Sequence, residues 1–206
     1  MITAEQLRTT FVSPAMKHYF DRKLAPLDSA EIDIRIEELL KYLNLAQYSQ
    51  GGIPFSIEID DAWHLWILQT KEYRGLCQKL QGGKFIHHSS NDYDDFLDPD
   101  VRSRPIDLLR AVGLLASYVL NYGPFEPRRA AHWPVVLRLA EGLGWSLDQF
   151  NTWLASVPGP GVADSAGISA GISAGTSAGI SVDISAGTNP GSNSSTSAAR
   201  AVELAA

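Results

Sequence analysis

Large aromatic side chains stop abruptly at Trp153 in this chain of 206 residues. All five Trp, all seven Tyr and all seven Phe residues lie at or before that position. A segment without large apolar side chains cannot bury enough surface to offset the entropy of ordering its backbone. The sequence therefore predicts one folded domain over 1–158 and a disordered, low-complexity tail over 159–206.

From Ser165 the tail repeats in units of four residues, mostly Ser-Ala-Gly-Ile or Ser-Ala-Gly-Thr. Repeats that stack into solenoids need about 20 residues or more. A Gly- and Ser-rich segment without aromatic residues is typical of a flexible coil. The alternative is a tether or a weakly β-forming tract through the isoleucines of the repeat, which are Ile168, Ile172, Ile180 and Ile184.

The formal net charge is −6, from 17 Lys and Arg residues against 23 Asp and Glu residues. An acidic chain without a basic run is a poor candidate for binding nucleic acid or an anionic membrane surface. The sequence also has no apolar stretch of the 18 or so residues that a membrane helix requires. We therefore expect a protein or small-molecule partner, with no nucleic acid and no membrane.

The cysteine content and the first residues bear on the cellular compartment. Cys77 is the single cysteine, so it cannot form a disulfide within the chain. Residues 1–5 lack the basic and apolar regions of a secretory signal. Both features favour a cytoplasmic protein.

Apolar residues recur at three- and four-residue steps through most of the first 158 residues, which is the spacing of amphipathic helices. Ser and Pro residues mark the expected starts of the helices. The expected helices lie over 15–23, from Ser29, from Ser56 to Gly82, from Ser103 to Gly123, on either side of Pro134, and from Ser146. No alternating strand pattern competes, so the sequence predicts an all-α fold of six or seven helices in a single compact domain.

Most of the residues that can carry chemistry gather in 59–88, which contains three of the five histidines. Asp60 and His64 are four residues apart and therefore share one face of a helix. A carboxylate and an imidazole in this arrangement can hydrogen-bond or ligate one divalent metal ion. Two ligands hold an ion poorly, and His87 and His88 are the donors that could complete the site.

The distance that His87 and His88 must cover is the main constraint on this site. A straight helix from His64 to Gln81 rises about 26 Å. The residues from Gln81 to His88 span at most about 24 Å when fully extended. The site therefore closes only if the loop runs back nearly extended, and an early helix end near Gly75 or Cys77 would relax the constraint.

The other large residues of this stretch fit a hydrophobic core. Trp63 and Trp66 are three residues apart, as in a buried helical stripe. Cys77 lies about 220° around the helix from His64, which favours a buried thiol over a ligand or a nucleophile.

The whole cluster also has a purely structural interpretation, which the residue types leave open. Asp60 is then an acid in the first helical turn, favoured by the helix dipole. His64 is its interior partner, and His87 and His88 lie on a turn.

Other titratable residues suggest weaker sites. His88 with three nearby acids, Asp92, Asp94 and Asp95, could bind a cation, although their spacing lacks the pattern of a calcium loop. His18 and His132 are isolated and are expected to be structural. Arg128 and Arg129 could bind an anion at a helix start, but they are expected to lie on the surface.

The motif of this stretch resembles a known family. It runs from Ile59-Asp60-Asp61-Ala62-Trp63-His64 through Tyr73 and Cys77 to Phe85-Ile86-His87-His88, with Tyr122-Gly123-Pro124 and Trp133-Pro134 further on. Together these residues resemble the bacterial proteins called glycine-rich domain-containing protein-like, and more distantly the plant glycine-rich-domain proteins. The likeness covers about 53–134. One departure is Gly82-Gly83-Lys84, where a shorter aromatic-glycine turn is expected.

The resemblance implies matched motif positions rather than an activity. The matched positions are Asp60, Trp63, His64, Tyr73, Cys77 and one of His87 or His88. The bacterial family carries no assigned reaction, and the RNA binding discussed for plant members involves additional domains.

Three functional hypotheses follow. The first is a divalent-metal site built from Asp60, His64 and one or both of His87 and His88, which could serve metal-assisted hydrolysis or oxidation. The second is a protein-interaction module without catalytic activity that uses the acidic loop over 91–100. The third is a structural helical body with a tether.

Overall fold

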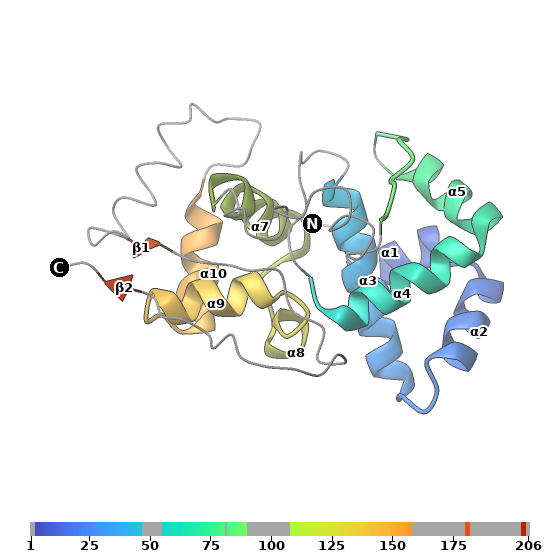
Figure 1. The fold of residues 1–206 in the computed structure, drawn as a ribbon, viewed down its shortest axis with the longest axis horizontal. Coiled ribbons are helices and arrows are strands. Elements are labelled where there is room, and N and C mark those ends of the chain that lie inside the picture. The colour runs from blue at the N-terminus through green and yellow to red at the C-terminus, as the bar shows by residue number, and fades with distance from the viewer. Residues whose placement is uncertain are drawn as a thin grey trace.

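The computed structural model describes residues 3–46, 55–80, 82–89 and 108–157, with two further pairs of residues at 180–181 and 203–204. Up to residue 157 the described chain consists of helices and connecting segments (Figure 1). The helices are α1 (Ala4–Phe11), α2 (Pro14–Lys23), α3 (Ser29–Ala46), α4 (Ile57–Leu68), α5 (Thr70–Lys79), α7 (Leu108–Tyr122), α8 (Pro127–Ala130), α9 (Pro134–Gly142) and α10 (Leu147–Ser156). The all-α prediction is confirmed for these residues.

The described part of the chain contains nine helices rather than six or seven. One addition is α1, which the hydrophobic spacing did not predict. It is fixed by a capping box, in which the Thr3 hydroxyl accepts from the Gln6 N–H and the Gln6 side chain accepts from the Thr3 N–H. The helix expected before Pro134 is the single turn of α8.

The second addition arises because the long helix expected after Ser56 breaks at Gln69, where the backbone leaves helical values at φ −93° and ψ 67°. In a straight helix, Trp63 and Tyr73 would lie about 15 Å apart along the axis. The bend instead brings the Trp63 Nε1–H within 3.0 Å of the Tyr73 hydroxyl. Burying both aromatic side chains therefore requires α4 and α5 to be separate helices.

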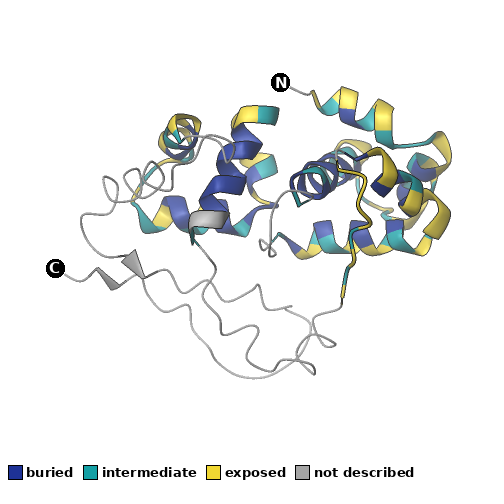
Figure 2. Cartoon of the chain, turned by 90° about the horizontal axis from the view of Figure 1, so that it is seen from above, coloured by how far each residue is buried: buried dark blue, intermediate teal, exposed yellow. Residues whose placement is uncertain are grey.

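The centre of the fold is α3, which packs against α1, α2, α4 and α7 (Figure 1). Its start differs from the prediction, because Asp28 rather than Ser29 caps it by accepting the Glu31 N–H at 2.8 Å. The core side chains of α3 are almost completely buried, namely Ile32, Ile36, Leu39, Leu40 and Leu43. Figure 2 shows the buried residues along the inner faces of the helices and the exposed residues on the outer faces.

The C-terminal helices form the other side of this core. α7 packs against both α3 and α10, and α9 packs against α8 and α10. Asn151 on α10 joins the loop after α7, because its side chain donates to the Phe125 carbonyl and accepts from the Phe125 N–H. Pro134 begins α9, so the predicted division at this proline is confirmed.

The predicted helix starts at serine residues have three outcomes. Ser146 caps α10 in a capping box with Gln149, as predicted. Ser56 stands at the start of α4 but makes no capping bond with its side chain, because its hydroxyl lies 3.1 Å from His132 Nδ1. The predicted start at Ser103 lies outside the described residues.

A buried polar network joins α3 to the C-terminal helices. Glu38 is fully buried and accepts from Lys41 and Arg129 at one carboxylate oxygen and from Tyr118 and Trp133 at the other, all at 2.7–2.8 Å. The expectation that both Arg128 and Arg129 lie on the surface is therefore wrong for Arg129. Four donors converge on one carboxylate, which offsets the desolvation of its charge.

The expected tail over 159–206 lies outside the described residues, apart from two strands of two residues each. These strands, β1 (Ile180–Ser181) and β2 (Glu203–Leu204), pair antiparallel with each other. Among the helices that the structure describes, none combines the length and the apolar character needed to cross a bilayer.

Candidate metal site

The first half of the candidate site lies on one turn of α4. His64 Nδ1 is 3.2 Å from Asp60 Oδ2 and 2.9 Å from the Asp60 main-chain carbonyl oxygen. This is the contact that the four-residue spacing predicts. Asp60 is partly buried and His64 is about half exposed, with side-chain exposures of 23% and 48%, so the pair faces solvent on one side.

The second half arrives from the segment 82–89, which follows a turn with positive φ at Gly82 and Gly83 (107° and 62°). The segment runs back toward α4 without forming a helix and is largely exposed (Figure 2). Because α4 ends at Leu68 and α5 takes a new direction, the chain has a shorter way to return than along one straight helix. The break at Gln69 thus removes the distance constraint on His88.

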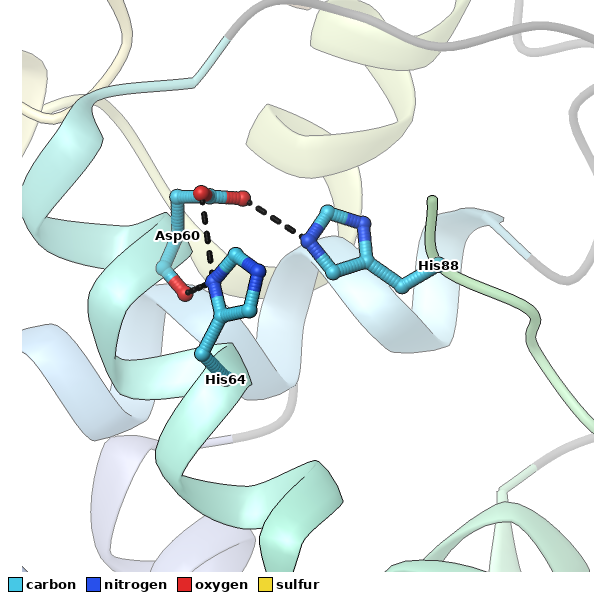
Figure 3. A group of neighbouring side chains, drawn as sticks. All are labelled: Asp60, His64 and His88. Atoms are coloured by element: carbon cyan, nitrogen blue, oxygen red, sulfur yellow. Dashed lines mark hydrogen bonds and ion pairs between the residues drawn. The ribbon is translucent and has the colours of Figure 1, made fainter. Parts of the chain in front are cut away.

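His88 approaches the other carboxylate oxygen of Asp60, beside His64 (Figure 3). Its Nε2 atom lies 3.1 Å from Asp60 Oδ1. The His88 ring stacks on Trp63, with centroids 4.2 Å apart and planes inclined by 17°. It also meets the His64 ring at a centroid distance of 4.6 Å. Three side chains from two separate segments therefore converge on one point.

The nitrogen that faces the centre of this group lacks a hydrogen bond. His88 Nε2 is buried, and its contact with Asp60 has the distance of an ion pair but not the geometry of a hydrogen bond. A buried imidazole nitrogen without a partner is unfavourable unless a proton or a cation satisfies it. One donor atom from each of Asp60, His64 and His88 lies within 4.8 Å of the other two.

The neighbouring histidine takes a different position. His87 is exposed, and its ring contacts Phe85 at a centroid distance of 4.9 Å. It stands outside the group that Asp60, His64 and His88 form. The alternation of side chains along an extended segment explains why only one of two adjacent histidines faces α4.

The other residues of the motif are buried as expected. Trp63, Trp66 and Cys77 are each at most 4% exposed, and the Cys77 thiol is free. The acids Asp92, Asp94 and Asp95, together with the loop over 91–100, lie outside the described residues.

Two tyrosines beside the site keep their protons. Burial raises the pKa of Tyr42 to about 12, and the negative charge of Asp60 adds to this effect. Burial also raises the pKa of Tyr73, so its hydroxyl stays a hydrogen-bond donor at neutral pH.

Tyr73 was matched by the motif, but its role depends on contacts that spacing does not predict. The hydroxyl accepts from Trp63 and donates to the Ile86 carbonyl, which lies 13 residues further along the chain. The one sequence signal for this role is that Tyr73 lies between the tryptophan helix and the histidine pair along the chain.

Comparison of the chain with family models, with curated proteins and with solved structures gives no match. The resemblance to the glycine-rich domain-containing protein-like family therefore stays a prediction that rests on the motif alone. The functional argument rests on the geometry of the cluster.

Proposed function

We propose that Asp60, His64 and His88 bind one first-row divalent metal ion. The observation that carries this proposal is the convergence of three donor atoms within 4.8 Å of one another, among them the buried His88 Nε2, which makes no hydrogen bond. Ligand atoms bonded to one ion at about 2.0–2.2 Å lie roughly 3–4 Å from one another. Small side-chain movements are therefore enough to close the site.

The donor set indicates which ions to expect. Two imidazoles and one carboxylate suit zinc, copper, nickel or iron better than calcium or magnesium, which prefer oxygen ligands. His87 is a fourth donor only if its ring turns away from Phe85. We therefore expect zinc or copper to bind at one equivalent, with Asp60, His64 and His88 as the ligands.

The exposure of the cluster bears on its chemistry. Three protein ligands leave one position of a tetrahedral ion for water or a substrate. His64 is about half exposed, so this position is accessible from solvent. An ion held in this way lowers the pKa of bound water and supports metal-assisted hydrolysis of a small molecule. A cytoplasmic location and the absence of nucleic-acid partners stay predictions from charge and cysteine content.

Metal binding is tested on the full chain, purified without a histidine tag. Titration calorimetry with Zn²⁺ and Cu²⁺ is expected to give one site in the wild type. His64→Ala and His88→Ala should each weaken binding by about tenfold or more, because each removes a ligand.

Two matched controls make this test specific. His18→Ala removes an exposed histidine on α2 that lies outside the cluster, and His87→Ala removes the neighbour of His88. Both are expected to bind like the wild type. Equal affinity in the wild type and in both His64→Ala and His88→Ala would contradict the proposal.

A further inference from the structure

A chain of hydrogen bonds links the tryptophan helix to the segment that carries His88. Trp63 Nε1–H donates to the Tyr73 hydroxyl at 3.0 Å, and this hydroxyl donates to the Ile86 carbonyl at 2.6 Å. Tyr73 is 2% exposed. Its bonds therefore form where water does not compete, which strengthens their effect on geometry.

Much of this segment is exposed to solvent. Residues 82–85 are exposed, as is His87. The preceding double glycine permits many backbone directions. The segment contacts α5 through the Phe85 ring and the Ile86 carbonyl, which both meet Tyr73. It contacts α4 through the His88 ring, which stacks on Trp63 and meets Asp60 and His64.

We infer that Tyr73 is a positioning residue for the metal site, since its hydroxyl holds the Ile86 carbonyl and thereby brings His88 within reach of Asp60 and His64. This inference rests on the proposed function. In this view, the break between α4 and α5 places the Tyr73 hydroxyl next to the returning segment. Tyr73 itself does not contact the ion.

The geometry explains why the hydroxyl matters more than the ring. Phe85 packs edge-on against the Tyr73 ring at a centroid distance of 5.4 Å, and this contact survives in Tyr73→Phe. Only the bonds to Trp63 and Ile86 are lost. Removing an outer-shell hydrogen bond of this kind typically weakens metal affinity by about 10- to 100-fold.

The test uses Cu²⁺, because nitrogen hyperfine splitting in its electron paramagnetic resonance spectrum counts the bound imidazoles. The wild type should show two nitrogens, and His88→Ala gives the reference spectrum with one. We expect Tyr73→Phe to show one nitrogen, or to bind copper about 10- to 100-fold more weakly. The stability of the metal-free variant, measured by urea unfolding in the presence of a chelator, should stay close to that of the metal-free wild type.

Tyr122→Phe is the matched control. This substitution also removes a hydrogen-bonded hydroxyl, which accepts from Asn44 at 2.7 Å. Tyr122 lies outside the cluster of Asp60, His64 and His88. Its copper affinity and spectrum should equal those of the wild type. A purely structural role of tyrosine hydroxyls would weaken binding equally in both variants and would overturn the inference.

The failures of the two proposals are distinguishable. If the wild type binds no copper, the metal site itself is wrong. If the wild type shows two nitrogens and Tyr73→Phe shows the same two at the same affinity, the inference on Tyr73 is wrong. Should Tyr73→Phe not fold, Phe85→Ala gives a second test, because it removes only the half-exposed ring that packs on Tyr73 and keeps the hydroxyl bond to Ile86. This variant should keep two nitrogens and the affinity of the wild type. Loss of the second nitrogen in it would assign the positioning of His88 to the ring contact and overturn the inference.

Discussion

Glu38 shows how far a single residue can depart from its usual environment. It is 0% exposed, although glutamate is among the residues least often fully buried. Its carboxylate accepts four hydrogen bonds, two of them from the cations Lys41 and Arg129. Burial lowers the pKa of Lys41 in spite of the nearby Glu38 charge. The ion pair with Glu38 therefore contributes more to stability than an ion pair between exposed side chains would.

Replacing Glu38 by Gln is expected to destabilise the protein by about 3–5 kcal/mol, because the buried Lys41 loses its counter-charge and the partly buried Arg129 keeps only its pairs with Glu37 and the exposed Glu126. Urea unfolding monitored by circular dichroism measures the change. Glu141→Gln, at an exposed position on α9, should alter stability by no more than about 0.5 kcal/mol. Equal effects of the two substitutions would contradict the argument.

Tyr42 makes the stability of the fold decrease at alkaline pH. Burial and the Asp60 charge raise its pKa to about 12 in the folded protein, from 10.0 as the ordinary value. Above pH 10 the unfolded chain releases this proton while the folded chain keeps it. The contribution is therefore complete below pH 10 and is lost as the pH rises to about 12, by up to about 3 kcal/mol.

Tyr42→Phe should consequently show a smaller loss of stability between pH 10 and 12 than the wild type. Urea unfolding at a series of pH values checks this, with tyrosinate absorbance as an independent measure of titration. The slope does not vanish, because burial also raises the pKa of Tyr73 and Tyr118. Parallel stability curves for variant and wild type would show that Tyr42 titrates normally.

At the level of elements, the caps determine where helices begin, and the aromatic contacts determine where they break. α10 begins at a reciprocal capping box between Ser146 and Gln149. α4 ends at Leu68, although no proline or glycine follows directly, because Trp63 and Tyr73 meet across the bend. Capping is a local effect of neighbouring residues, whereas the break depends on packing.

Ser146→Ala is expected to destabilise the protein by about 1 kcal/mol, since the Gln149 N–H loses its acceptor. Thermal or urea unfolding measures the loss. Thr152→Ala is the control within the same helix, because its exposed hydroxyl bonds only to the carbonyl one turn back. The control should be neutral or slightly stabilising, and a loss below about 0.3 kcal/mol for Ser146→Ala would refute the capping role.

At the level of the whole molecule, α3 joins the two groups of helices. It packs against α1, α2 and α4 on one side and against α7 on the other. The Glu38 network adds polar links from α3 to α7, α8 and the residue before α9. Disrupting α3 should therefore unfold both groups together.

Deleting residues 158–206 should leave this helical body intact. All large aromatic residues lie at or before Trp153, so the deletion removes little that could contribute to a core. The unfolding midpoint should change by no more than about 2 °C, and zinc affinity should stay the same. A fall of more than about 4 °C, equivalent to roughly 1 kcal/mol for a chain of this size, would show that the tail packs against the helices.

The sequence alone determined the helical class, the cap at Ser146, the start of α9 at Pro134 and the contact between Asp60 and His64. Each of these depends on residues within one or two turns, where helix geometry and capping chemistry act directly. The sequence did not predict α1, the break at Gln69 or the partial burial of Arg129.

Only the tertiary structure decided that His88, and not His87, meets Asp60 and His64. That choice depends on Tyr73 holding Ile86 and on Trp63 stacking against the imidazole. These partners are 13 and 25 residues apart along the chain. Such contacts form only after α4 and α5 have packed at an angle, so residue spacing alone cannot specify which histidine faces the carboxylate.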